Sequence, residues 1–174
     1  MVSLRRGLAK RQAQIFAGLA ILCSVCLTFS PGMAVGQDLF FAEPAEIVDG
    51  DSFWVVTADR RVEVRLWGID CPEWTQPYGR EAKERTAELL AGGQLRVEVK
   101  DTDIYGRTVA LVFAGTTNVN EELVRSGSAW VFPRYCRQSI CTQWKELQLN
   151  AQQEGIGLWH LPRPEPPWNK RRKN

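Results

Sequence analysis

The chain has 174 residues, 44% of them hydrophobic, which is enough for one ordinary globular domain and too few for two. Its formal net charge is only +2, without the large excess of basic residues expected of a simple cationic nucleic-acid binder. The single histidine, His160, stands near the proline-rich end of the chain, which argues against catalytic triads with a histidine base, and one histidine cannot form a metal site built from several. No glycine-rich loop of the P-loop type occurs.

Residues 1–36 are typical of a secretory signal peptide. Four basic residues precede an apolar run, residues 15–29, and small residues follow it. We expect cleavage after Ala34 or Gly36 and a secreted or periplasmic protein. An uncleaved membrane anchor is the alternative, although a membrane span needs about 20 apolar residues. Without the leader, 18 basic and 20 acidic residues remain, a net charge of −2.

The next part of the chain alternates in the manner of strands and turns. The hydrophobic pattern predicts strands over 45–48, 52–57, 61–69, 94–100 and 108–115. Asp49-Gly50-Asp51 joins the first two strands, and Asp-Gly is a strong hairpin signal. The period of two in the third strand directs Arg65 away from the aliphatic face. The last strand is more continuously apolar, so we expect it to be buried on both faces.

Three helices are predicted, over 79–90, 119–127 and 141–155. The first is expected to bury Ala82, Ala87, Leu89 and Leu90, and the third Trp144, Leu147 and Ala151. Asn118 or Asn120 is expected to cap the second helix. One helix between the third and fourth strands, and two after the fifth, indicate an α+β protein with a five-stranded OB-fold barrel and three packed helices.

Composition divides the chain into three parts. We predict the leader over 1–36, the folded domain over 37–161, and a tail over 162–174. The tail contains four prolines and ends in basic residues, so we expect it to be extended or disordered.

The cysteine pattern agrees with export. Cys23 and Cys26 belong to the leader, while Cys136 and Cys141 stand five positions apart in a polar segment. This spacing favours a local disulfide in an oxidising compartment. A metal-binding cysteine pair is the alternative, and no further Cys/His cluster supports it. Cys71 is left without a partner.

Three pairs of acidic residues stand at strand ends. The pairs are Asp49 with Asp51, Asp70 with Glu73, and Asp101 with Asp103. Aspartates are also common in turns for purely structural reasons. However, every pair borders a strand, and Arg65 and Arg107 accompany two of them. Carboxylates without nitrogen or sulfur ligands favour a hard cation such as calcium or magnesium.

Six segments, taken together in this order, resemble the thermonuclease family of staphylococcal-nuclease-like secreted nucleases. The segments are VDGDSFWV, VRLWGIDCPE, YGREAKERT, DTDIYGRTVA, VNEELVRSGSAWV and GIGLW. The resemblance runs from Ala45 to Trp159. It implies an OB-fold core and calcium-dependent hydrolysis of DNA and RNA that leaves 3′-phosphate ends. It implies no stable protein partner, and we expect a monomer.

The resemblance also implies roles for individual residues, carried over by position. The expected calcium ligands are Asp51, Asp70 and the backbone carbonyl of Cys71, whose side chain would then be free to vary. The expected general base is Glu73, the expected phosphate-binding arginines are Arg65 and Arg107, and the expected nucleotide-pocket tyrosines are Tyr105 and Tyr135.

The chain departs from the family pattern at three positions. Ser52 stands where the family usually has threonine, and Ile104 and Pro133 replace a lysine and a tyrosine of the nucleotide pocket. These changes concern the grip on the leaving nucleotide and leave the catalytic set intact. The rival hypothesis is a catalytically silent OB-fold module that binds nucleic acid or protein. Such a module is expected to lose part of the active set, which this chain retains.

Overall fold

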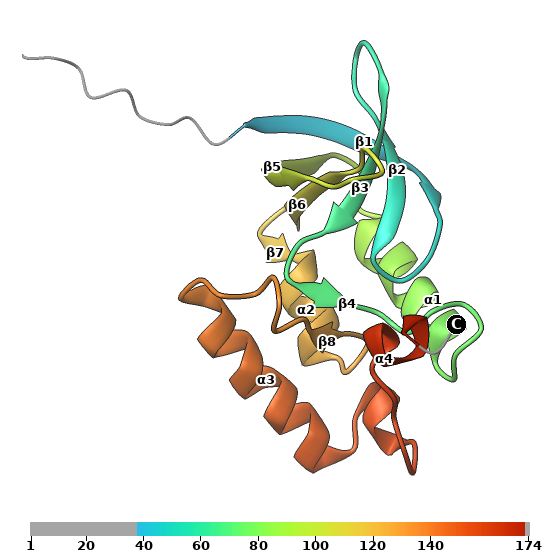
Figure 1. Ribbon diagram of the computed structural model, residues 1–174. Helices are drawn as coiled ribbons and strands as arrows, with labels where there is room; N and C mark the ends of the chain where they lie inside the picture. The colour runs from blue at the N-terminus through green and yellow to red at the C-terminus, as the bar shows by residue number, and fades with distance from the viewer. Residues whose placement is uncertain (1–37, 173–174) are drawn as a thin grey trace, which may run out of the picture. The chain divides into compact units, whose positions relative to one another are not determined.

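In a computed structural model, residues 38–172 form a closed five-stranded barrel with helices packed against it (Figure 1). The barrel strands are β1 (Leu39–Ile47), β2 (Ser52–Val56), β3 (Arg61–Leu66), β5 (Leu95–Thr102) and β6 (Thr108–Ala114). Neighbouring strands are antiparallel, and a parallel pairing of β3 with β6 closes the barrel. The expected α+β class and OB-fold barrel are confirmed.

The described residues begin after the predicted leader. Residues 1–36, with Cys23 and Cys26, lie outside them, so the signal peptide stays a prediction. Within residues 38–172, no helix is both long enough and apolar enough to span a membrane.

The first strand is longer than the sequence predicts. It starts at Leu39 rather than at residue 45 and contains Pro44. Its register against β2 shifts between Pro44 and Glu46, where the strand bulges. Proline cannot donate a ladder hydrogen bond and is tolerated in strands at bulges. A proline that looks like a boundary in the sequence therefore lies inside the strand.

The barrel interior is filled by alternating aliphatic side chains and one phenylalanine. The fully buried strand residues are Phe53, Val55, Val64, Leu95, Val97, Ala110 and Val112. Three consecutive residues of β6, Ala110 to Val112, are buried, as expected for a strand covered on both faces. Burial of this apolar surface is the main force that holds the barrel together.

Three helices lie where the sequence predicts them, namely α1 (Gly79–Leu90), α2 (Val119–Arg125) and α3 (Ile140–Glu154). Helix α2 contacts α1, α3 and β6, so it is central to the helical layer. Figure 1 shows this layer below the barrel. Three short strands, β4 (Ile69–Asp70), β7 (Thr117–Asn118) and β8 (Trp130–Val131), connect the two parts, and β4 pairs with β8.

The two candidate caps of α2 have different roles. The side chain of Asn118 caps the helix by accepting a hydrogen bond from the Glu121 N–H at 3.2 Å. Asn120 is completely buried, and its amide accepts from the Val112 N–H at 3.0 Å and donates to the Trp67 carbonyl at 2.9 Å. Asn120 therefore ties α2 to β6 and to the chain just after β3.

One inward position of α1 was predicted wrongly. Ala87 is exposed, and Thr86 is buried in its place, on the same face as Ala82 and Leu90. These three positions repeat every four residues, whereas Ala87 lies on the next face round. The Thr86 hydroxyl donates to the Gly50 carbonyl at 2.5 Å, so α1 holds the turn between β1 and β2.

The tail is not extended throughout. Residues 167–171 form the short helix α4 (Pro167–Arg171), and the 3₁₀ helix η1 (Gly157–His160) lies just before the tail. The sequence predicts neither element. Proline at the first position is favourable because its fixed φ suits a helix start. Trp168 of α4 stacks on Phe132 with ring centroids 4.9 Å apart.

Two glycines set the path of the chain before the tail. Gly127 and Gly157 both have positive φ, and the Leu158 N–H donates to the Gly127 carbonyl at 2.8 Å. A Cβ atom on Gly157 would lie 2.3 Å from that carbonyl oxygen. Only glycine allows this backbone approach, which fixes η1 against the end of α2.

Cys136 and Cys141 form a disulfide, as the sequence predicts, and both are buried next to α3. Closing so short a loop reduces the conformational entropy of the unfolded chain, which stabilises the fold by roughly 2 kcal/mol in the chain-entropy model.

We expect reduction of the Cys136–Cys141 bond to lower the free energy of unfolding by that amount, measured by urea denaturation with and without dithiothreitol. A Cys136→Ala/Cys141→Ala variant should be insensitive to the reductant. An unchanged midpoint for the reduced protein would contradict the prediction.

Candidate active site

The turn between β1 and β2 places Asp51 inside the protein. The side chain of Asp49 accepts hydrogen bonds from the N–H groups of Asp51 (3.0 Å) and Ser52 (2.8 Å), which fixes the turn. Asp51 is only 4% exposed, and its Oδ2 accepts from the Cys71 N–H at 2.6 Å. Its carbonyl accepts from the Leu66 N–H at 2.8 Å. Asp51 thus joins the start of β2 to the end of β3 and to the residue after β4.

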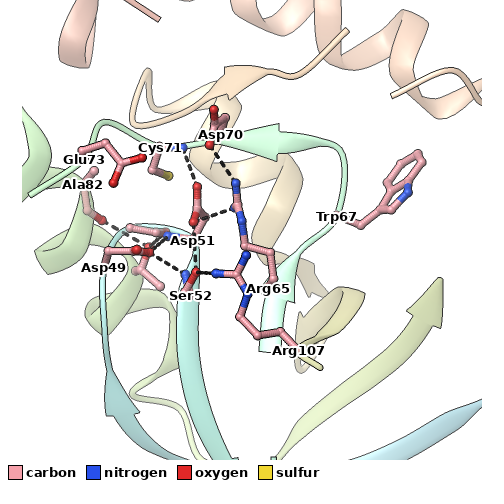
Figure 2. Close-up of polar contacts among 12 residues, drawn as sticks. Asp49, Asp51, Ser52, Arg65, Trp67, Asp70, Cys71, Glu73, Ala82 and Arg107 are labelled. Atoms are coloured by element: carbon pink, nitrogen blue, oxygen red, sulfur yellow. Dashed lines mark hydrogen bonds and ion pairs between the residues drawn. The ribbon is translucent and has the colours of Figure 1, made fainter. Parts of the chain in front are cut away.

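Arg65 lies between two buried carboxylates (Figure 2). Its Nη1 is 2.6 Å from Oδ1 of Asp51, and its Nη2 donates to Oδ1 of Asp70 at 2.7 Å. The alternation along β3 directs Arg65 away from Val64 and Leu66 in the core, as predicted. Nη1 is buried and has no partner in hydrogen-bond geometry among the described residues. Both terminal nitrogens of Arg65 nevertheless face carboxylates, which fixes the orientation of the guanidinium.

Burial makes these carboxylates unusual acids. Loss of solvent raises the pKa of Asp51 well above its usual range, and Arg65 opposes the rise. Burial also raises the pKa of Asp70, again opposed by Arg65. Repulsion between Asp51 and Asp70 adds to the effect on Asp51. A second cation near the two carboxylates would therefore be stabilising.

Arg107 reaches the same region from the turn before β6. Its Nε donates to Oδ2 of Asp103 at 2.7 Å, and its Nη1 donates to the Ser52 hydroxyl at 3.3 Å. Burial acts to raise the pKa of Asp103, but hydrogen bonds from the side chain and backbone of Arg107 bring it below its usual value. Figure 2 shows the guanidinium of Arg65 directed at Asp51 and Asp70 and that of Arg107 directed at Ser52.

Glu73 follows β4 on a loop near Asp70. Its N–H donates to the Gln76 side chain at 2.9 Å, which fixes the loop, and its side chain is 36% exposed. Its carboxylate accepts a hydrogen bond from Arg171, which also donates to Oδ2 of Asp70 at 2.6 Å. The loop therefore presents an accessible carboxylate beside the buried one.

The two predicted pocket tyrosines differ in their surroundings. Tyr105 is 78% exposed and lies beside Arg107, whose guanidinium carbon is 5.5 Å from the ring centroid. Tyr135 is 55% exposed and contacts Phe132 edge-on, with centroids 5.0 Å apart. Ile104, in place of the family lysine, is 91% exposed. The structure places Tyr105 against a site arginine, and it shows no such contact for Tyr135 among the described residues.

Known proteins with similar sequences identify the family of this chain. A family model described as staphylococcal nuclease homologue matches residues 63–161, more than half of the chain. The chain belongs to the staphylococcal nuclease family. Similar proteins include a micrococcal nuclease of Shigella flexneri, 34% identical over 76% of this chain and 81% of its own length. An uncharacterized endonuclease of Haemophilus influenzae is 33% identical, over 88% and 86%. Protein ParB of Escherichia coli is 30% identical, over 95% and 96%.

Family membership makes the chain a nuclease, a hydrolase that acts on phosphodiester bonds. The family model matches a region that includes Arg65, Asp70, Glu73 and Arg107, whereas Asp51 lies before it. The structure brings Asp51, Arg65 and Asp70 into direct contact, with Glu73 and Arg107 at the edges. The individual catalytic roles remain predictions from the resemblance.

The side chain of Cys71 is more constrained than the sequence indicates. It is buried as a free thiol, and its Cβ would lie 2.6 Å from a Cβ placed on Gly50. A side chain at Gly50 would therefore overlap Cys71 and move the turn that carries Asp51. The Cys71 side chain packs directly on this turn, and the prediction that only its carbonyl serves the metal stays a prediction.

Staphylococcal nucleases are generally metal-dependent, and the donor set here fits a hard cation. Asp51 and Asp70 supply carboxylate oxygens, and no sulfur or imidazole ligand stands with them. In residues 38–172, no group of three or more His, Cys, Asp or Glu side chains is arranged to hold a metal. Two carboxylates and a backbone carbonyl would leave positions for water and a substrate phosphate.

Three residues at the site were not predicted to act there. Asp49 fixes the turn that carries Asp51, Thr86 holds the same turn from α1, and Arg171 contacts Asp70 and Glu73. The Asp-Gly-Asp sequence contains a signal for Asp49, and the register of α1 contains one for Thr86. Nothing in the local sequence indicates the third, because its partner Asp70 is 101 positions away.

Asp103 orients Arg107, and the Asp103→Asn variant tests this. We expect it to lose about 1 kcal/mol of stability at pH 7, because the ion pair is partly exposed. A carboxyl group with a lowered folded-state pKa stabilises the protein above its ordinary pKa and loses that contribution as pH falls through the folded-state value. The difference in stability between wild type and the Asp103→Asn variant should therefore disappear below about pH 4. Thermal unfolding of both proteins across pH 3–7 measures this difference, and a difference that stays constant with pH would contradict the prediction.

Proposed function

We propose that the chain is a calcium-dependent endonuclease that hydrolyses DNA and RNA and leaves 3′-phosphate ends. The observation that carries the proposal is the Arg65 guanidinium held between buried Asp51 and Asp70. We further propose that the leader directs export and that the nuclease acts as a monomer. The Cys136–Cys141 disulfide supports an oxidising compartment.

The two arginines suit the charge that develops during hydrolysis. Attack of water on phosphorus increases the negative charge on the non-bridging phosphate oxygens, and preorganised donors stabilise it. The guanidinium of Arg65 lies at the two buried carboxylates, and that of Arg107 contacts the Ser52 hydroxyl at the start of β2. Asp51 and Asp70 hold the first in place, and Asp103 holds the second.

A bound calcium ion would supply Lewis-acid polarisation of the phosphate at Asp51, Asp70 and the Cys71 carbonyl. Glu73 would accept the proton of the attacking water. It is accessible, is positioned by Gln76, and stands three residues from Asp70. Cleavage of the bond between phosphorus and the 5′ oxygen would leave the phosphate on the 3′ side. Tyr105 offers an exposed ring beside Arg107, where a nucleoside could stack.

Glu73→Gln tests the base. With plasmid DNA and calcium chloride, we expect the variant to lose about 10²- to 10⁴-fold in turnover, the usual range for a general base. Wild-type activity should vanish with a calcium chelator and return when calcium is restored. The products should become substrates for 3′ extension only after phosphatase treatment. Activity that survives both the chelator and the substitution would overturn the mechanism.

Arg107→Ala tests phosphate binding. We expect a loss of about 10²- to 10³-fold in turnover, comparable to removal of one transition-state donor, with an unchanged circular dichroism spectrum. Arg134→Ala serves as the control, because Arg134 is an exposed arginine next to Tyr135. A near-normal rate for Arg107→Ala would remove this residue from the site. Absence of hydrolysis of DNA and RNA by wild type with any divalent metal would instead favour the silent OB-fold module.

A further inference from the structure

The C-terminal tail, residues 162–172, brings a basic side chain to the candidate active site. Nη2 of Arg171 donates to Oδ2 of Asp70 at 2.6 Å, and Nη1 donates to the carboxylate of Glu73. These acceptors are the expected metal ligand and the expected general base. A single guanidinium therefore engages the two groups on which the proposed reaction depends.

Contacts along the tail hold α4 in the position that delivers Arg171. Pro167 is buried, and the Trp168 ring is stacked on Phe132 with an interplanar angle of 2°. Nζ of Lys170 donates to the Thr75 hydroxyl at 2.8 Å. The contact of Arg171 with the site is thus built by the helix as a whole and does not depend on one flexible side chain.

The Arg171 end of the tail is nevertheless open to solvent. The Arg171 side chain is 45% exposed, against 14% for Arg65. A cavity of about 240 Å³ lies between the tail and the rest of the domain, lined by Pro72, Gln76 and Trp130 on one side and by Pro164, Glu165 and Lys170 on the other. Release of the tail costs the contacts of Pro167 and Trp168 as well as the Arg171 ion pairs, so binding of metal at Asp70 must offset that cost.

We propose that α4 is an autoinhibitory strap, an inference that rests on the proposed nuclease function. Arg171 acts as a tethered cation that competes with the divalent metal for Asp70 and with the attacking water for Glu73. Binding of metal and substrate must displace it. The nuclease is therefore inhibited when divalent metal is scarce, and the inhibition is relieved when the metal is abundant.

The geometry favours inhibition over a third phosphate-binding arginine. Both terminal nitrogens of Arg171 are directed at carboxylates, Nη2 at Asp70 and Nη1 at Glu73. The two acceptors of Arg171 are also the groups that a metal ion and a water molecule need. Among these contacts, the one to Glu73 bears most directly on inhibition, because it engages the group expected to accept the proton of the attacking water.

Titration of the full exported protein with calcium chloride alone, by isothermal calorimetry, tests the strap directly. We expect Arg171→Gln to bind calcium about fivefold more tightly than wild type, the factor that a partly exposed ion pair supplies. Trp168→Ala, which removes the stacking contact, should shift affinity in the same direction. Arg172→Gln is the matched control, because Arg172 makes no ion pair among residues 38–172 and its loss changes the tail charge equally.

DNA hydrolysis at calcium concentrations below saturation provides the second readout. Faster hydrolysis by Arg171→Gln, with Arg172→Gln at the wild-type rate, supports the strap. Equal calcium affinity in wild type and Arg171→Gln overturns it while leaving the proposed function intact, provided that hydrolysis is normal. Weaker calcium binding or slower hydrolysis by Arg171→Gln also overturns it and makes Arg171 a positioning residue. Absence of both calcium binding and hydrolysis in every protein refutes the proposed function and the strap together.

Discussion

Two carboxylates cannot be buried next to each other without a cation between them, and Arg65 meets this requirement. Asp51 and Asp70 lose nearly all contact with water, and each faces the same guanidinium. Removal of one partner from a buried ionic group is far more costly than loss of a surface pair, because an uncompensated charge remains. The end of β3, the Asp-Gly-Asp turn and β4 are thereby held in one arrangement. The barrel core, the buried amide of Asn120 and the Thr86 hydroxyl all support that arrangement from behind.

The site is consequently rigid on one side and adjustable on the other. Asp51 and Arg65 belong to barrel strands and turns that are fixed by backbone hydrogen bonds, so they are preorganised before any ligand arrives. Glu73, Tyr105 and Arg171 lie on loops or on the tail, and their side chains are partly or largely exposed. Groups that bind a phosphate benefit from a fixed position, whereas groups that admit water or a nucleoside benefit from access.

Much of this arrangement could be predicted from the sequence, because its signals are local. Asp49-Gly50-Asp51 allows few conformations other than a tight turn, and the period of two in β3 determines the face of Arg65. The bounds of α1 follow from a run of helix formers that ends before Gly92-Gly93. The sequence could not predict contacts between distant segments. Pro44 looks like a break until its strand partner is known, and the tail looks disordered until Trp168 meets Phe132.

The backbone contact between Gly127 and Gly157 also matters for how this nuclease is handled in the laboratory. It directs the chain out of η1 so that its last described residues lie beside Asp70 and Glu73. Any sequence fused after residue 174 would start within a few residues of the catalytic face. A polyhistidine tag there would place metal-chelating imidazoles next to a site that itself has none, and would distort both metal titrations and rates. Affinity tags for this protein therefore belong at the amino end of the barrel domain, before β1.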